Sequence, residues 1–228
     1  FPAPGGGTTT VFADLWLGLD VGTDIALSNT IAREIIASDL HDRTFIERAT
    51  ENFEAYAESV ADWTLERGAA VTGVPAEVIR EVAHRYATAD RAMICWTLGI
   101  TEHHNAVDNV LALINLGLLT GHVGRYGSGL NPLRGQNNVQ GGGDMGAIPN
   151  KLPGFQDIEQ NAEARARFEA AWDVSIIPTY GYTLTQMFEA MDRGELTAAY
   201  VIGENPASSE ADKQHTEELL VGLDTLIV

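Results

Sequence analysis

The sequence predicts an α/β fold with parallel sheets. Residues 91–97 form an apolar run followed by a glycine turn and a long helical pattern, which is typical of a strand–helix crossover. Residues 197–202, 210–221 and 225–228 predict a strand, a helix and a second strand. A glycine-rich segment separates these two regions. Because open α/β sheets bind ligands at the carboxyl ends of their strands, the turn after each strand is a candidate binding site.

The N-terminal part is predicted to be mainly helical. After a tail at residues 1–10, the alternating residues 11–19 predict a short strand. Thr23 or Asp24 can cap a helix at residues 25–37. Further helices with one apolar side are expected at 42–49, 51–67 and 75–87. These helices predict a packing layer that carries no catalytic groups.

The middle of the chain is expected to hold a buried strand and a long helix. Cys95 lies within the apolar strand at 91–97 and is interpreted as a small core residue, not a nucleophile or ligand. The helix begins at His103 and His104 and ends at Gly121, a residue suited to the C-terminal cap. Neighbouring helical residues point about 100° apart. With no third ligand nearby, the two histidines therefore do not predict a metal site.

The C-terminal part alternates helices and strands. A helix is expected from Ala162 to Trp172, followed by a loop and a second helix at 183–193. Ser208 or Ser209 is expected to cap the helix that lies between the last two strands.

Composition limits the possible partners. The chain has 228 residues and a formal net charge of −18, which argues against a nucleic acid held through its phosphates. No run of 18 apolar residues occurs, so no membrane span is expected, and without a signal peptide we expect a cytoplasmic location. The single cysteine excludes an intrachain disulfide and a four-cysteine metal site. The acidic, lysine-poor composition fits either adaptation to high salt or an ordinary acidic protein.

Residues 121–154 are the most informative segment. They are too rich in glycine for a helix or strand, yet they carry Arg134, Gln136 and further amides, which a flexible linker would lack. Amides offer donors and acceptors together, and arginine offers a planar fork for an anion. Because long ordered loops are usually functional, the segment predicts a large polar ligand lying close to the backbone. A surface loop with ordinary turn chemistry is the alternative.

This segment also carries a family resemblance. The run Leu133-Arg134-Gly135-Gln136-Asn137-Asn138-Val139-Gln140-Gly141, followed by Asp144-Met145-Gly146-Ala147 and Pro149-Asn150, resembles the signature of the catalytic subunit of molybdopterin-dependent formate dehydrogenases. These enzymes belong to the molybdopterin oxidoreductase (dimethyl sulfoxide reductase) family. The similarity extends from about Ala13 to Val228.

The resemblance implies parallel-sheet Rossmann-like lobes with flanking helices, as parts of two central domains of that family. Residues 11–135 would form the C-terminal part of a dinucleotide-binding-like α/β domain. Residues 136–228 would begin a second α/β cofactor-binding domain.

The resemblance also implies roles for individual residues. Arg134 matches the arginine that lies beside the metal and holds the formate carboxylate. Without the motif, an ion pair with one of the 32 acidic residues would be the ordinary expectation for Arg134. The positions that match cofactor contacts are Gly22, Asp24, Leu98, Gly99, Glu102, Gln136, Asn205 and Ser209.

Two of these positions depart from the family pattern. Leu98 replaces a methionine, and Glu102 replaces a glutamine. The second departure changes the chemistry, because an amide donates and accepts hydrogen bonds whereas an ionised carboxylate only accepts. Glu102 would therefore meet the cofactor differently or not at all.

The implied cofactor is bis-molybdopterin guanine dinucleotide with molybdenum or tungsten, and the implied reaction is the oxidation of formate to carbon dioxide. The family's metal-binding cysteine or selenocysteine and its N-terminal iron–sulfur cluster have no counterpart here, and no residue is predicted as a metal ligand. We therefore expect an internal fragment that is inactive alone. Its expected partners are formate, the missing domains of the same chain and an iron–sulfur electron-transfer subunit.

Two alternatives remain open. The first is a nitrate reductase-like or other molybdopterin oxidoreductase, which the sequence around the metal-binding cysteine would distinguish. The second is a non-catalytic α/β module that binds a nucleotide or a protein, for which titration with guanine nucleotides is a direct test.

Overall fold

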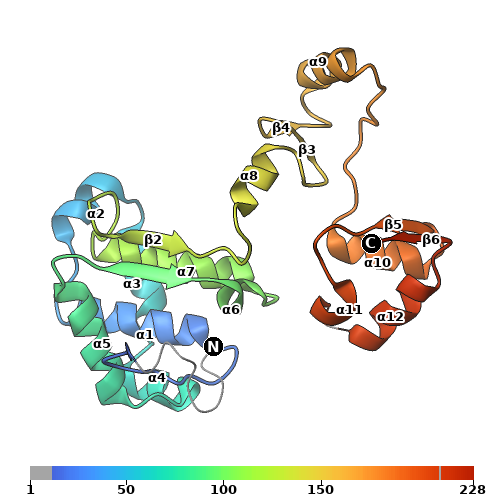
Figure 1. The fold of residues 1–228 in the computed structure, drawn as a ribbon. Helices are drawn as coiled ribbons and strands as arrows, with labels where there is room; N and C mark the ends of the chain where they lie inside the picture. The colour runs from blue at the N-terminus through green and yellow to red at the C-terminus, as the bar shows by residue number, and fades with distance from the viewer. Residues whose placement is uncertain (1–11, 211) are drawn as a thin grey trace. The chain divides into compact units, whose positions relative to one another are not determined.

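The computed structural model describes residues 12–210 and 212–228, which form two compact units (Figure 1). The first unit extends to Asn137, and the second begins at Asn138. The expected tail at 1–10 lies outside the described residues. The predicted α/β class with parallel strands is confirmed, since each unit contains one parallel strand pair. The two predicted domains, with their boundary at 135/136, stay a prediction.

The first unit packs helices around a central helix, α1 (Asp24–Ala37), which contacts α3, α4, α5 and α7. The other helices of this unit are α2 (Arg43–Ala49), α3 (Phe53–Val60), α4 (Leu65–Thr72), α5 (Ala76–Thr88), α6 (Leu98–Thr101) and α7 (Ala106–Leu119). Strand β1 (Met93–Trp96) pairs in parallel with β2 (Gly129–Pro132). Helix α7 contacts both α1 and β2, so it connects the helical layer to the sheet.

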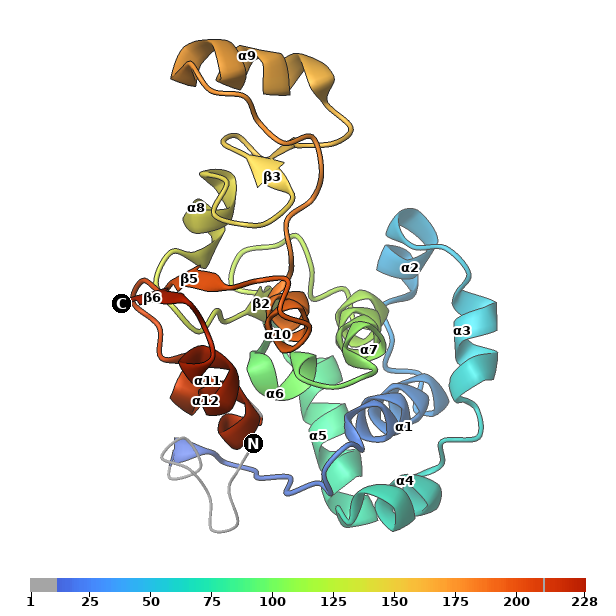
Figure 2. The ribbon, with the colours of Figure 1, turned by 90° about the vertical axis from the view of Figure 1, so that its right-hand side faces the viewer.

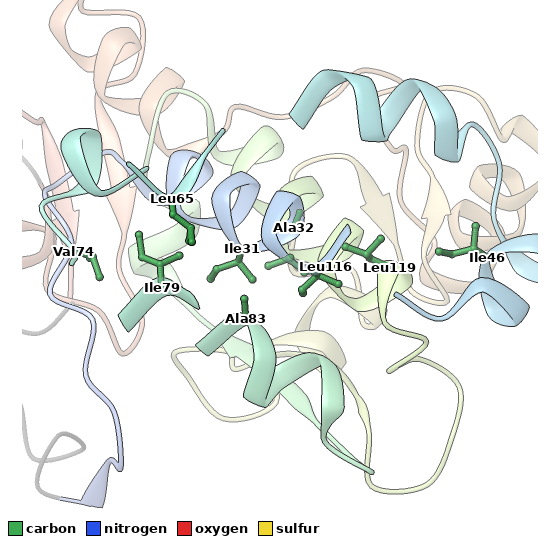
Figure 3. Close-up of a cluster of buried hydrophobic side chains, with 10 residues drawn as sticks. Ile31, Ala32, Ile46, Leu65, Val74, Ile79, Ala83, Leu116 and Leu119 are labelled. Carbon is green, nitrogen blue, oxygen red and sulfur yellow. The ribbon is translucent and has the colours of Figure 1, made fainter. Parts of the chain in front are cut away.

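The core of this unit lies between α1, α4, α5 and α7 (Figure 3). Ile35 of α1 and Ile79 of α5 have no exposed surface. Figure 3 shows Ile79 and Ala83 of α5 beside Ile31 of α1, with Leu116 of α7 next to Ile31. Burial of an aliphatic side chain of this size contributes about 1.5–3 kcal/mol, so this cluster holds the four helices together.

The second unit begins with the short helix α8 (Val139–Asp144) and a hairpin of β3 (Lys151–Leu152) and β4 (Gln156–Asp157). Helices α9 (Ala162–Trp172) and α10 (Leu184–Asp192) follow, as predicted, and Thr183 and Gln186 form a capping box at α10. Strand β5 (Ala198–Tyr200) pairs in parallel with β6 (Thr225–Ile227), and between them lie α11 (Pro206–Ser209) and α12 (Lys213–Val221).

The strand predicted at 11–19 is wrong for the residues that the structure describes, and Val11 lies outside them. Residues 12–20 form no strand. Leu17 and Leu19 pack on the core, whereas Trp16 is exposed. The alternation therefore arises from an extended segment that lies on the helical layer without a partner strand.

Three predicted helix boundaries are also wrong. The helix expected at 51–67 is two helices, because Thr64 starts α4 by accepting the N–H of Arg67. The long helix begins at Ala106 and not at His103, which follows α6. In the second unit Asp212, rather than Ser208 or Ser209, caps the helix before β6.

The glycine-rich segment is more regular than predicted, since it contains β2 and α8. Asn138 makes the start of α8 possible by adopting a left-handed φ of 56°. The predicted burial of Cys95 is wrong as well. Met93 and Cys95 are exposed on one face of β1, whereas Ile94 on the other face packs against the core.

A buried core predicts a large cost for truncating Ile35. We expect Ile35→Ala to lower the free energy of unfolding of this chain by about 3 kcal/mol, because the substitution loses burial and leaves a cavity. The matched control is Val107→Ala on α7, where 73% of the side chain is exposed. This control should change the unfolding free energy by less than about 0.5 kcal/mol in urea titrations. Equal effects of the two substitutions would contradict the core assignment.

Asp157 predicts a pH dependence of the second unit. The pKa of its carboxyl group lies well below the usual range, because the Gln160 N–H, the Lys151 ammonium and the Tyr180 hydroxyl donate to the carboxylate. Folding lowers this pKa, so the carboxylate stabilises the folded state above about pH 4, and this stabilisation is lost as the pH falls through the folded-state pKa.

We therefore expect Asp157→Asn to melt below the unsubstituted chain at pH 7, and the difference to shrink below about pH 4. Thermal scans at several pH values measure this. Asp224→Asn is the control, since Asp224 is exposed and its side chain makes no hydrogen bond within the described residues. A pH-independent difference for Asp157→Asn would contradict the assignment.

Candidate functional site

The carboxyl edge of the β1–β2 pair brings two candidate segments together. The strands are parallel, and Trp96 at the end of β1 lies opposite Pro132 at the end of β2. The N–H of Leu133 continues the pairing by donating to the Trp96 carbonyl at 2.7 Å. The turn that carries Leu98 and Gly99 therefore leaves the sheet beside the segment that carries Arg134.

Helix α6 forms the turn after β1. It is a single turn that ends with the Glu102 N–H donating to the Leu98 carbonyl at 2.8 Å. Leu98 is half exposed and Glu102 is exposed, so both side chains are accessible from solvent. Their backbone is fixed from the other side, where His103 Nε2 bonds the Gly99 carbonyl at 2.8 Å and Asn109 Nδ2 donates to the Ile100 carbonyl at 3.0 Å.

Arg134 and Gln136 lie in the exposed segment after β2. Within the described residues, Arg134 has no carboxylate within 4.0 Å and its side chain makes no hydrogen bond. The guanidinium is therefore free to bind an anion with its planar set of donors. A Cβ placed on the neighbouring Gly135 would meet no atom within 4 Å, so a ligand can approach the backbone here.

Gly22 and Asp24 lie at the start of α1. Gly22 adopts a φ of +83°, which favours glycine, and a Cβ there would meet no atom within 4 Å. Thr23 closes the turn by donating its hydroxyl to the Asp20 carbonyl at 2.6 Å. Asp24 is the first residue of α1, where the positive end of the helix dipole favours a carboxylate.

This turn faces the same end of the first unit as the carboxyl edge of the sheet (Figure 2). Helices α1 and α7 pack together, and the Asp42 N–H after α1 donates to the Leu119 carbonyl at the end of α7. The two helices therefore run in the same direction. Because α7 follows β1 and α6, its start and the start of α1 lie at the end where β1 finishes.

Asn205 and Ser209 belong to the second unit, where they follow the carboxyl end of β5. The Asn205 Nδ2 donates to Ser208 Oγ at 3.1 Å, and Ser209 Oγ donates to the Asn205 carbonyl at 3.2 Å. Both residues are exposed, and Gly203 before them has a φ of +65° with open space around a Cβ. The turn thus offers an amide and a hydroxyl on an accessible backbone.

Each of the two units carries polar groups on accessible turns. Three turns combine glycines open to solvent with amide, hydroxyl or carboxylate groups. In residues 12–210 and 212–228, no three His, Cys, Asp or Glu side chains are grouped closely enough to hold a metal ion. None of the helices in these ranges is long and apolar enough to cross a membrane.

The sequence pattern alone identifies neither His103 nor Asn109, whose side chains pair the backbone carbonyls of the turn after β1, as a support of that turn. A signal for Asn109 was present, since it interrupts the apolar residues of α7 and is 3% exposed in the structure. A polar side chain inside an apolar helix predicts a specific hydrogen-bond partner.

The chain is similar to known proteins over nearly its whole length. Residues 5–228 match the family model described as "Molybdopterin oxidoreductase". The chain is 40% identical over 216 residues to the F420-dependent formate dehydrogenase subunit alpha of Methanocaldococcus jannaschii, covering 95% of this chain and 32% of the relative. It is 38% identical over 221 residues to formate dehydrogenase H of Escherichia coli, covering 96% of this chain and 31% of that protein.

Among solved structures, the acetylene hydratase from Pelobacter acetylenicus is similar in fold, with a TM-score of 0.67 and 22% sequence identity. The match covers 96% of this chain and 32% of the hydratase chain. The chain thus spans about a third of the length of the relatives it matches.

The structure defines an α/β protein in which exposed turns follow the carboxyl ends of the parallel strands β1, β2 and β5. The chain belongs to the molybdopterin oxidoreductase family.

Proposed function

We propose that the full-length protein containing this chain is a molybdopterin-dependent formate dehydrogenase. The observation that carries the proposal is the free guanidinium of Arg134, exposed after β2 and without a carboxylate partner in the described part of the chain. Support also comes from relatives that are named formate dehydrogenases and are 38–40% identical over nearly the whole chain. Because the chain spans about a third of their length, the activity belongs to the longer protein.

Arg134 would bind the substrate. Formate is a one-carbon carboxylate, and a guanidinium can hold both of its oxygens through two parallel charge-assisted hydrogen bonds. The chain carries a formal net charge of −18, so most of its surface repels an anion. A local unpaired cation is therefore needed to attract and orient formate, and Arg134 supplies it.

The reaction converts formate into carbon dioxide, one proton and two electrons. When bound, the cofactor supplies a molybdenum or tungsten centre that accepts the two electrons. The residues of this chain hold the substrate carboxylate and seat the cofactor. They also leave the backbone open at Gly22 and Gly135, where a Cβ would meet no neighbouring atom.

The cofactor would be bis-molybdopterin guanine dinucleotide. Asp24 would accept hydrogen bonds from a guanine, and Gln136 and Asn205 would offer paired donors and acceptors. Glu102 accepts but does not donate when ionised, so it would receive a hydrogen bond from the cofactor. The other proposed cofactor contacts are Leu98, Gly99 and Ser209.

We also propose the remaining parts of the system. An iron–sulfur cluster elsewhere in the full-length chain would take the electrons and pass them to an iron–sulfur subunit. The protein would work in the cytoplasm.

Arg134→Gln tests the substrate role in the full-length protein. Hydrogen bonds to charged groups contribute about 1.5–3 kcal/mol each. Since 1.4 kcal/mol corresponds to a factor of ten, kcat/KM for formate should fall at least about 100-fold. In Arg134→Lys, kcat/KM should fall less, because lysine keeps the positive charge but lacks the planar pair of donors of the guanidinium. Steady-state kinetics with a dye acceptor measure this.

The control for this substitution is Arg48→Gln. Arg48 is an exposed arginine on α2 with no ion pair among the described residues. It should leave formate kinetics unchanged, and both variants should keep the pterin content of the parent. Unchanged formate kinetics in Arg134→Gln would exclude the proposed substrate role.

A second prediction concerns cofactor retention. Asn205→Ala removes the side-chain amide at the carboxyl end of β5, so the full-length protein should retain less pterin per chain. Fluorescence of the oxidised, released pterin measures this. Ser208→Ala is the matched control, because it removes the same Asn205–Ser208 hydrogen bond and leaves Asn205 in place. Equal loss of pterin in both variants would show that pterin retention depends on the conformation of the turn and not on direct binding by the Asn205 amide.

A further inference from the structure

We infer that Asn109 is a positioning residue that holds the turn after β1 in place beside Arg134. The inference rests on the proposed function, since the turn carries the proposed cofactor contacts Leu98, Gly99 and Glu102. Asn109 itself is buried and would not touch substrate or cofactor.

The turn cannot hold its own shape. Helix α6 has four residues, and a helix of one turn is unstable alone because few of its hydrogen bonds are formed within it. Its first carbonyl, that of Leu98, accepts the Glu102 N–H. The next two carbonyls, of Gly99 and Ile100, are paired by side chains that come after the helix.

Asn109 connects the turn to the core of the first unit. It lies in the first turns of α7, is 3% exposed, and donates its side-chain amide to the Ile100 carbonyl at 3.0 Å. Helix α7 in turn packs along α1, whose side chains form the centre of the core. The position of the Ile100 carbonyl is thereby tied to the buried core of the unit.

The second side chain that pairs a carbonyl of α6, His103, is held less firmly than Asn109. His103 bonds the Gly99 carbonyl, but it is only partly buried and lies in the connection between α6 and α7. A side chain in a connection moves with that connection, whereas Asn109 lies on a packed helix. An asparagine at a buried position also loses apolar burial relative to leucine, so the hydrogen bond is the feature that explains its presence.

The experiment compares Asn109→Leu, Asn109→Asp and Thr30→Val in the full-length protein. Thr30 is the matched control because it is fully buried, donates to the Ala26 carbonyl at 2.7 Å within α1, and lies beside Gly68 of α4. The two readouts are amide hydrogen exchange of residues 98–102 and kcat/KM for formate.

We expect Asn109→Leu to speed exchange of the Ile100 and Glu102 amides about tenfold and to lower kcat/KM about 10- to 100-fold, because a displacement of about 1 Å at a reacting site is costly. Thr30→Val should leave the amide exchange of residues 98–102 and kcat/KM unchanged, even where it loses as much thermal stability as Asn109→Leu. In Asn109→Asp, the amide exchange rates of residues 98–102 should return toward those of the parent as the pH falls, because the protonated acid regains a donor for the Ile100 carbonyl.

Parent-like exchange of residues 98–102 in Asn109→Leu would overturn the inference, and so would equal effects of Thr30→Val on exchange and kcat/KM. Hydrogen exchange needs no turnover. If the parent protein did not oxidise formate, the proposed function would fail, and the exchange data would still decide the role of Asn109.

Discussion

The candidate site depends on the parallel pairing of β1 with β2. Two segments that are more than 30 residues apart in sequence leave the sheet at the same edge because Trp96 and Pro132 are paired in register. The Leu133 N–H then bonds back to the Trp96 carbonyl, which keeps the chain in contact with its neighbour for one more residue. A shift of this register by one residue would reverse the side of the sheet on which the side chains of the shifted strand lie.

The packing of the helical layer also places the Gly22 turn at the end of the unit where β1 stops. The parallel course of α1 and α7, maintained by the Asp42–Leu119 backbone bond and the core around Ile35, brings the start of α1 to the end where β1 stops. The Gly22 turn and the carboxyl edge of the sheet thus lie at the same end of the first unit. The binding groups lie on turns, and the rigidity comes from packed helices. This division is common where loops are positioned by a scaffold.

Sequence reasoning located the elements better than it described their surroundings. The strand at 91–97 and the turn after it were predicted in the right place, because apolar runs and glycine are local signals. Burial of Cys95 could not be predicted, since exposure depends on what lies over each face of the strand, and in the described structure only the Ile94 face is covered. The cap of α12 was misplaced because Ser208, Ser209 and Asp212 are all good caps, and tertiary context chose Asp212.

The site residues also differ in how far the sequence alone could identify them. The motif around Arg134 was readable because its residue types and order carry the chemistry, whereas Asn109 became visible only through its partner in α6. The structure adds one fact that the motif could not supply. Glu102 follows β1 as Arg134 follows β2, on neighbouring strands of an acidic chain, yet no carboxylate of the described residues lies within 4.0 Å of the guanidinium. A paired arginine would have to break an ion pair before binding an anion, and its affinity would fall accordingly. An arginine that stays unpaired at the carboxyl edge of a sheet, among 32 acidic residues, is therefore the strongest structural argument for an anionic substrate.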